Sequence, residues 1–237
     1  NPKLNAITVE NFDLAQTNSE KPFTGFFQGV PTFIKDTDEV PDLPLYLGSR
    51  SLPGEPSDKY SKAAKQIIDT GLNCLGTTTT PEFGLTGTTE SLRFGATCNP
   101  WNTAYSTGGS SGGSSALVAA GVIPIAHAND GAGSIRIPAS CCGLVGLKAS
   151  RGRIKDKEVP GYLPANILHD GVVTRSVRDT WAFHAEIEKN IPATEFPPIG
   201  DISESFPKNL KIAVLTENCL GENSSAELVQ ATHDVAK

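Results

Sequence analysis

The feature that most constrains the fold of this chain is the alternation of strand and helix patterns along its 237 residues. Residues 30–34 form an apolar run that is typical of a strand. Residues 57–71 follow with apolar side chains at helical spacing, between a cap-like Ser57 and Gly71. Residues 72–75 then repeat the strand pattern. This strand-helix-strand unit predicts an α/β sheet.

Elements of both kinds continue along the rest of the chain. We expect helices over residues 115–120, 176–188 and 225–237, and strands over residues 122–128 and 210–215. Residues 155–167 and 191–202 are rich in proline and charge, which indicates excursions of the chain over the surface. The length favours one large domain.

The charge and cysteine content exclude several classes of protein. The formal net charge is −6 at pH 7, and no basic run would follow a phosphate backbone or an anionic membrane surface. No apolar stretch approaches the roughly 20 residues of a membrane span, and the polar start does not resemble a signal peptide. The five cysteines lack the spacing of a disulfide framework or a zinc ribbon. We therefore expect a soluble, cytoplasmic protein without metal or cofactor, and with no nucleic-acid or membrane partner.

Glycine and serine fill residues 107–115, which lead directly into an apolar helical segment. A flexible linker would not end in this way, whereas glycines that open a helix leave its free N–H groups facing the loop. The G-x-S-x-G pattern around Ser110 is the nucleophile motif of α/β-hydrolases, but the polar residues 99–107 replace the strand that this motif needs. Phosphate-loop and dinucleotide fingerprints do not fit either. The histidines after Ser110 lack a setting that marks a base: His127, His169, His184 and His233.

A second serine, Ser134, follows three small residues directly after Asp130. Successive backbone N–H groups in such a segment can turn toward one point without obstruction by side chains, which forms a nest for an oxyanion. The alternative is an ordinary glycine turn between two elements of the fold.

Lys35 follows the first predicted strand and has apolar neighbours. A lysine at the end of a strand is usually a solvated charge. Burial would instead lower its pKa from about 10.4 toward the range in which a neutral amine acts as a base. Together, the two serines and Lys35 would then offer a nucleophile, a relay hydroxyl and a base without histidine.

These segments together resemble the amidase signature family. The matching blocks keep the family's order and cover nearly the whole chain: residues 29–36, 80–84, 99–101, 108–114, 130–138 and 142–148. The resemblance implies a mixed, twisted β-sheet core covered by helices. Residues 127–140 look most like bacterial amidases that act on linear or cyclic non-peptide amides, which include nylon-oligomer cyclic-dimer hydrolases. The resemblance implies a small-molecule amide as the partner of this chain. Whether the protein forms a homodimer stays open.

The resemblance also implies the roles of individual residues. Ser134 resembles the nucleophile, Ser110 the middle serine that follows a cis peptide bond, and Lys35 the base. Gly109 before that bond and Ser111 beside it are supporting residues. An acyl-enzyme intermediate is expected. Four consecutive backbone N–H groups are expected to form the oxyanion hole, those of Gly131, Ala132, Gly133 and Ser134.

Two positions depart from the family pattern, and two other functions stay open. Ala132 stands where the family commonly has glycine, and the threonines of residues 77–80 replace a stretch that contains a lysine. An amidotransferase subunit usually carries glutamine where this chain has Ile137. A catalytically silent binding paralogue is the second alternative.

The family's chains are about twice as long as this one, so the sequence resembles their N-terminal half. We expect residues 1–237 to form a single incomplete domain that lacks the N-terminal helix and the C-terminal half. Such a fragment would have an incomplete sheet and little activity of its own.

Overall fold

The computed structural model describes residues 1–154, 167–190, 196–200, 209, 211–218 and 220–236. The chain divides into two compact units, residues 1–202 and 203–237, which are described separately. The second unit contains helix α6 (Ala226–Val235), whose first turn is capped by the Ser225 hydroxyl accepting from the Leu228 N–H. Among the described residues, no helix combines the length and the apolar character that a membrane span requires.

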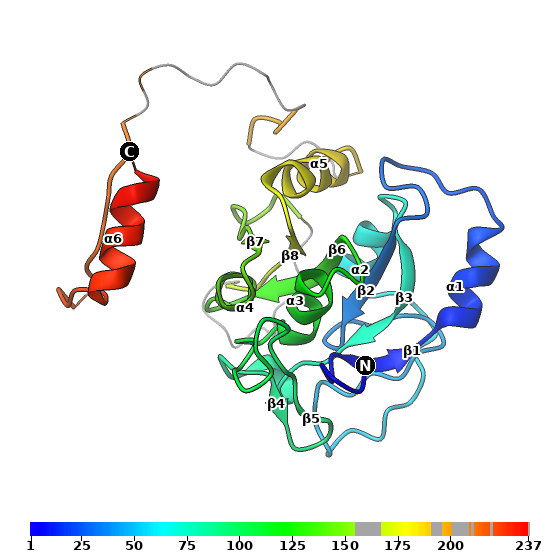
Figure 1. The fold of residues 1–237 in the computed structure, drawn as a ribbon. Coiled ribbons are helices and arrows are strands. Elements are labelled where there is room, and N and C mark those ends of the chain that lie inside the picture. Colours follow the sequence, from blue (N-terminus) through cyan, green and yellow to red (C-terminus); the bar gives the residue numbers. More distant parts are fainter. Residues whose placement is uncertain (155–166, 191–195, 201–208, 210, 219, 237) are drawn as a thin grey trace. The chain divides into compact units, whose positions relative to one another are not determined.

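The first unit is an α/β structure, as the sequence predicts (Figure 1). Its helices are α1 (Phe12–Ser19), α2 (Lys62–Ile68), α3 (Gly112–Ala119), α4 (Arg136–Cys142) and α5 (Val177–Glu188), with a 3-10 helix over Glu82–Gly84. Its strands are β1 (Ile7–Glu10), β2 (Pro31–Lys35), β3 (Asn73–Thr78), β4 (Glu90–Ser91), β5 (Gly95–Ala96), β6 (Ile125–Asp130), β7 (Val145–Gly146) and β8 (His169–Thr174).

The predicted strand-helix-strand unit is confirmed. Strands β2 and β3 pair in parallel, with Lys35 opposite Thr78, and α2 connects them. Strand β1 pairs antiparallel with β3, which gives the order β1-β3-β2. A second sheet has the order β6-β8-β7 with antiparallel pairing. Strand β6 lies beside β2, where the Thr32 hydroxyl donates to the Ile125 carbonyl oxygen at 3.1 Å. Toward the other ends of these strands, Lys35 of β2 and Asn129 of β6 are also within hydrogen-bond distance.

Several element boundaries differ from the prediction. Helix α2 is capped by Ser61, whose hydroxyl accepts from the Ala64 N–H at 3.2 Å, and not by Ser57. Helix α3 begins at Gly112, earlier than predicted, because the glycines themselves form its first turn. Strand β6 begins only at Ile125, since the N–H of the exposed Val122 closes the end of α3 by donating to Leu117.

The strand predicted over residues 210–215 is wrong for the part that the structure describes. Residues 211–215 are exposed and have no regular structure, and residue 210 lies outside the described range. A strand needs a neighbour that accepts its backbone hydrogen bonds, and no described strand pairs with this segment. The predicted excursions over 155–167 and 191–202 fall mostly outside the described residues.

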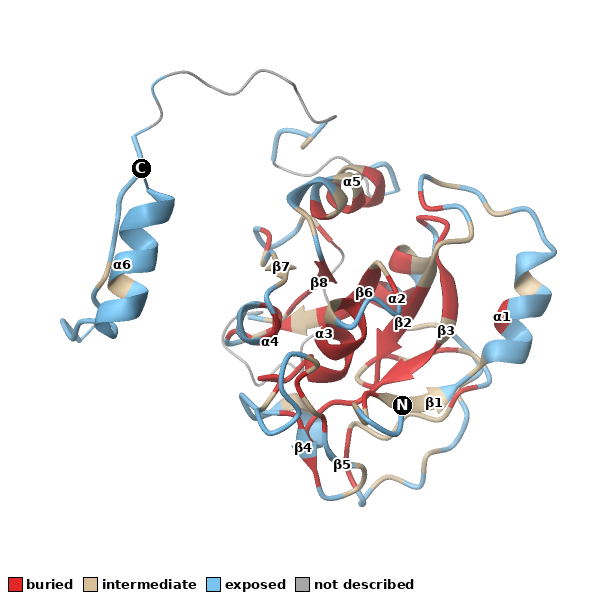
Figure 2. Ribbon diagram, viewed as in Figure 1, coloured by how far each residue is buried: buried red, intermediate tan, exposed pale blue. Residues whose placement is uncertain are grey.

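Two clusters of buried apolar side chains hold the first unit together. Figure 2 shows that the buried residues of this unit include most of β2, β3, β6 and β8. Successive side chains of a strand point to opposite faces, and β2 therefore contributes Phe33 to one cluster and Ile34 to the other. Ile34 shares its cluster with Ile67 of α2 and Phe183 of α5. Helix α5 is confirmed, because the Ser176 hydroxyl caps it by accepting from the Asp179 N–H at 3.1 Å.

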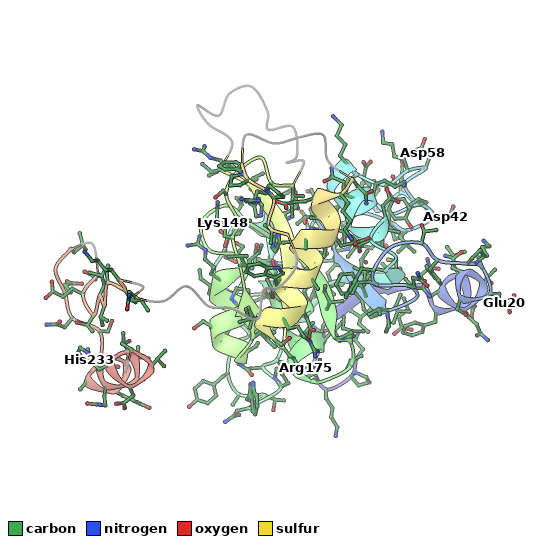
Figure 3. All side chains as sticks on the ribbon, turned by 90° about the horizontal axis from the view of Figure 1, so that it is seen from above. Glu20, Asp42, Asp58, Lys148, Arg175 and His233 are labelled. Atoms are coloured by element: carbon green, nitrogen blue, oxygen red, sulfur yellow. The ribbon has the colours of Figure 1, made fainter. Side chains whose placement is uncertain are left out.

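A surface arginine fixes the end of α3. Arg175, labelled in Figure 3, donates from Nη1 to the carbonyl oxygens of Val118 and Ile123 at 2.9 and 2.8 Å. The last carbonyl groups of a helix have no partner within the helix, so this side chain satisfies one of them. The contact joins the end of β8 to the turn that leads from α3 into β6.

Acid should weaken the fold through its buried histidines. Burial lowers the pKa of His184 on α5 to about 4, and that of His169 likewise to about 4. The unfolded chain therefore takes up these protons first, and the free energy of unfolding falls as the pH drops from about 6.5 toward 4. Burial raises the pKa of Asp36 to about 6, which acts in the opposite direction.

We predict that His184→Leu reduces the loss of unfolding free energy between pH 7 and pH 5 by about 2 kcal/mol. Urea unfolding at both pH values measures this difference for the parent chain and the variant. The matched control is His233→Leu, at an exposed position of α6. An equal pH dependence in the parent chain and in His184→Leu would contradict the prediction.

Candidate active site

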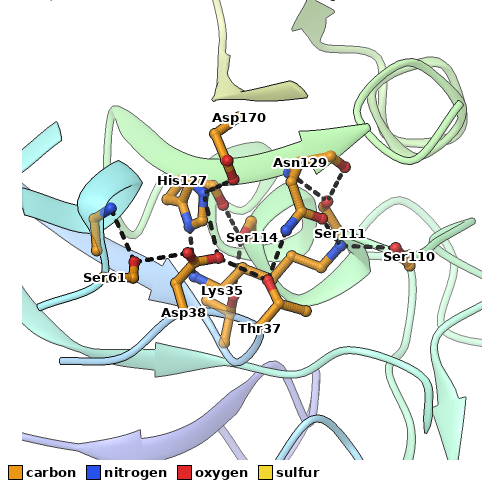
Figure 4. Close-up of polar contacts among 12 residues, drawn as sticks. Lys35, Thr37, Asp38, Ser61, Ser110, Ser111, Ser114, His127, Asn129 and Asp170 are labelled. Carbon is orange, nitrogen blue, oxygen red and sulfur yellow. Dashed lines mark hydrogen bonds and ion pairs between the residues drawn. The ribbon is translucent and has the colours of Figure 1, made fainter. Parts of the chain in front are cut away.

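The side chain of Lys35 is fully buried at the end of β2, where it contacts two distant segments (Figure 4). Its Nζ donates to Ser110 Oγ at 2.7 Å and to Asn129 Oδ1 at 2.6 Å. Ser110 lies in the loop before α3, and Asn129 lies near the end of β6. The fold thus brings three separate segments to one amine. The alternative of a solvated lysine is excluded by its burial.

The loop that carries Ser110 is held in place by its neighbours. The peptide bond between Gly109 and Ser110 is cis, as the sequence resemblance implies. A Cβ atom at Gly109 would lie 2.6 Å from the Thr88 carbonyl oxygen, so only glycine fits there. The Thr89 hydroxyl donates to the Gly108 carbonyl at 2.9 Å and accepts from the Gly112 N–H at 3.1 Å. These bonds fix both sides of Ser110.

Ser134 lies beside this loop. Its carbonyl oxygen accepts the N–H of Ser111 at 3.3 Å, directly after Ser110. The Ser111 hydroxyl in turn donates to the Asn129 carbonyl at 3.3 Å and accepts the Asn129 N–H at 3.4 Å, which ties the loop to β6. Ser134 is partly exposed, whereas Ser110 is buried. Within the described residues the Ser134 hydroxyl makes no hydrogen bond. The backbone contact with Ser111 brings residue 134 to the loop that carries Ser110.

Asp130 organises the turn that precedes Ser134. Its carboxylate accepts the N–H groups of Gly133 at 2.7 Å and Ile135 at 3.2 Å, and the Arg136 guanidinium donates to both of its oxygens. Burial opposes ionisation of Asp130, but Arg136 and the two N–H groups outweigh it and hold the pKa of that carboxyl below its usual range. The turn is therefore built around an ionised carboxylate.

This arrangement corrects the expected oxyanion hole at one position. The N–H of Gly133 donates to Asp130 and is not available to a ligand. The N–H groups of Gly131, Ala132 and Ser134 have no hydrogen-bond partner among the described residues. Three of the four predicted donors thus remain available.

A buried histidine behind Lys35, His127, was not predicted from the sequence as a site residue. His127 Nδ1 accepts the backbone N–H of Lys35 at 3.1 Å, so the hydrogen of the neutral ring must be on Nε2. That nitrogen donates to Asp170 Oδ1 at 3.1 Å. The alternation of side chains along a strand could have identified His127, because a period of two puts His127 and Asn129 of β6 on the same face. His127 holds the backbone of Lys35 and does not contact Ser110.

The atoms of Asp38, His127 and Asp170 lie within 4.8 Å of one another and form a group that could be considered as a metal site. A histidine that binds a metal donates its other ring N–H to a neighbour. His127 does the opposite, because its other nitrogen accepts the Lys35 N–H. The protonated Nε2 therefore fits a hydrogen bond to a carboxylate and not a bond to a metal ion.

We predict that His127→Leu lowers the free energy of unfolding by about 3 kcal/mol, because a backbone N–H and a carboxylate are left buried without partners. Urea unfolding followed by circular dichroism measures the change, with His233→Leu as the exposed control. A loss below about 1 kcal/mol, the range of an ordinary hydrogen bond, would show that His127 does not anchor β2.

Comparison with known proteins gives matches over the whole chain. The Amidase family model matches residues 2–237. The protein named "Putative amidase AmiC" from Mycobacterium tuberculosis is 46% identical over 239 residues, which cover 100% of this chain and 50% of that protein. The chain therefore spans about half the length of the curated relatives it matches.

Solved structures match as well. A structure of 6-aminohexanoate cyclic dimer hydrolase complexed with substrate has a TM-score of 0.85 and 38% identity, and the match covers 100% of this chain and 51% of that one. A bacterial aryl acylamidase that belongs to the amidase signature enzymes has a TM-score of 0.72 and 36% identity. That match covers 78% of this chain and 40% of the other.

Proposed function

We propose, from the premise that this chain belongs to the amidase family, that it hydrolyses carbon–nitrogen amide bonds with Ser134 as the nucleophile. The chain has the fold of the amidase signature enzymes. The observation that carries the proposal is the 2.7 Å hydrogen bond between the buried Lys35 Nζ and Ser110 Oγ. This pair can supply a base and a relay hydroxyl to the partly exposed Ser134, whose backbone contacts Ser111 of the same loop.

The proposed reaction begins with the neutral amine of Lys35. Burial removes water from the charged form of a lysine and so favours the neutral form. The amine takes a proton from Ser110, which takes the proton of Ser134 as Ser134 Oγ bonds to the amide carbonyl carbon. The negative charge that develops on the carbonyl oxygen is held by the free N–H groups of Gly131, Ala132 and Ser134.

The second half of the reaction releases both products. The C–N bond breaks as the proton returns from Lys35 through Ser110 to the leaving nitrogen, which departs as an amine and leaves an acyl group on Ser134. Water then attacks the acyl carbon and gives its proton to the same relay. Collapse of this intermediate returns the proton to Ser134, releases the carboxylic acid and restores neutral Lys35.

The surroundings of the serines support a non-peptide amide as substrate. A Cβ atom at Gly84 would lie 3.4 Å from Ser110 Oγ, and the flanking Phe83 and Leu85 are exposed apolar side chains. Ile137, which packs against Gly108, is also exposed. We propose linear or cyclic non-peptide amides with apolar chains, a class that includes the substrate named for the cyclic-dimer hydrolase. The apolar Ile137, where an amidotransferase subunit would carry glutamine, disfavours that alternative.

A fluorophosphonate probe tests the proposal, because it forms a covalent bond with an activated serine. Applied to the intact protein that carries this chain, it should label the parent and not Ser134→Ala. Lys35→Met should slow the labelling at least about 100-fold, the usual contribution of a general base. Labelling is followed by gel fluorescence over time, with circular dichroism to confirm that each variant is folded.

The matched control is Ser140→Ala, which removes an exposed hydroxyl from α4 and should label at the parent rate. Absence of labelling in the parent at any pH up to 10 would favour the catalytically silent paralogue. Undiminished labelling of Ser134→Ala would place the nucleophile elsewhere.

A further inference from the structure

Asn129 joins the amine of Lys35 to a second hydrogen-bonded group (Figure 4). Its Oδ1 accepts from Lys35 Nζ at 2.6 Å, and its Nδ2 donates to Thr37 Oγ1 at 2.7 Å. The Thr37 hydroxyl donates in turn to Asp38 Oδ2 at 3.0 Å. The other oxygen of the buried Asp38 accepts the Ser61 hydroxyl at 2.7 Å. Amine, amide, hydroxyl and carboxylate thus form one chain.

The donors in this chain all point in the same direction, and this fixes how the amide of Asn129 is oriented. A carboxylate only accepts hydrogen bonds, so the Thr37 hydroxyl must give its hydrogen to Asp38. Its oxygen can then only accept from Asn129, which requires Nδ2 on that side. The carbonyl oxygen of the amide therefore faces Lys35. A flipped amide would present its NH₂ group to Lys35, where it would oppose the charged amine or occupy the lone pair of the neutral one.

The consequence concerns the lone pair of Lys35. A neutral amine has two N–H groups and one lone pair, and an amide oxygen can only bind to an N–H group. The lone pair is therefore kept away from Asn129. In the neutral amine it can accept the Ser110 hydroxyl across the same 2.7 Å contact, in which the charged amine is the donor. An uncharged amide also differs from a carboxylate, which at 2.6 Å would hold the amine in its charged form.

We propose that Asn129 is a positioning residue, which aims the lone pair of neutral Lys35 at Ser110 and meets the amine with an uncharged oxygen. The proposal rests on the proposed amidase function. Asn129 acts through Lys35 and not through contact with a substrate.

Other titratable groups lie around Lys35 and stay unchanged in the test. The segment after β2 carries Asp36 and Asp38, and β3 carries Cys74. Strand β6 carries His127 and Asp130, β8 carries Asp170 beside His127, and α3 carries no titratable group. Because this background is constant, a substitution at Asn129 changes one charge in a fixed environment.

The test is Asn129→Asp, with two readouts on the intact protein. The first is the ionisation of Lys35, followed by the ¹³Cε resonance of labelled lysine, which Lys35→Arg identifies by its loss. A carboxylate this close should raise the titration midpoint of Lys35 by about 1 to 3 pH units. The second readout is the pH dependence of fluorophosphonate labelling. Labelling at neutral pH should fall at least about tenfold and recover as the pH rises past the new midpoint.

Two further variants complete the design. Asn102→Asp makes the same change at an exposed position and should leave the Lys35 midpoint and the labelling rate unchanged. Asn129→Ser removes the amide without adding charge, and it should slow labelling at every pH without raising the midpoint.

The proposal is overturned if Asn129→Asp keeps the parent's midpoint and pH profile, or if folded Asn129→Ser labels at the parent rate. Failure of the amidase function itself looks different. In that case the parent protein is not labelled at any pH, whereas the shift in the Lys35 resonance reports on Asn129 independently.

Discussion

The site depends on one interaction, the burial of the Lys35 amine against Ser110 and Asn129. A buried lysine is tolerated only when its polar atoms have partners, and here these partners come from the loop before α3 and from β6. Each of the other features serves this contact. The apolar clusters on both sides of β2 shield it from water, and the packing of β2 beside β6 brings Lys35 to Asn129.

Two separate sets of hydrogen bonds hold Lys35. Its backbone is fixed through His127, which is itself held by Asp170. Its side chain is oriented through Asn129 and Thr37, which end on Asp38. One set determines where the lysine lies and the other determines how its amine points. The same division recurs at Ser134, where Asp130 uses its carboxylate to shape the turn and leaves neighbouring N–H groups free.

The sequence predicted the parts that depend on local pattern. The helical spacing before Gly71 located α2, and the glycines before Ala116 located α3, because both signals lie within one element. The resemblance to a family placed Lys35 and Ser110 together, and their side chains do form a hydrogen bond. Periodicity alone does not identify such a contact between residues 75 positions apart.

The remaining features depend on tertiary partners that a local pattern does not contain. Ser57 and Ser61 are equally good caps by type, and only the packing of α2 selects Ser61. In the sequence, the N–H of Gly133 cannot be told apart from the neighbouring N–H groups as an oxyanion donor. In the structure, it donates to the Asp130 carboxylate. His127 showed no motif because its role is to hold another residue's backbone. The segment 211–215 has strand-like composition but no described strand to pair with.

The most direct test of the account is to locate the acyl group after reaction with a chromogenic acyl anilide. The intact protein is quenched in acid, cleaved by chymotrypsin and analysed by mass spectrometry. Cleavage after Leu117 separates Ser110 and Ser111 from Ser134, and fragmentation of the modified peptide distinguishes Ser134 from Ser140. If Ser134 is the nucleophile, the added acyl mass lies on the fragment with Ser134. An acyl group on Ser110 or Ser111, or anilide hydrolysis without any acylated serine, would contradict that assignment.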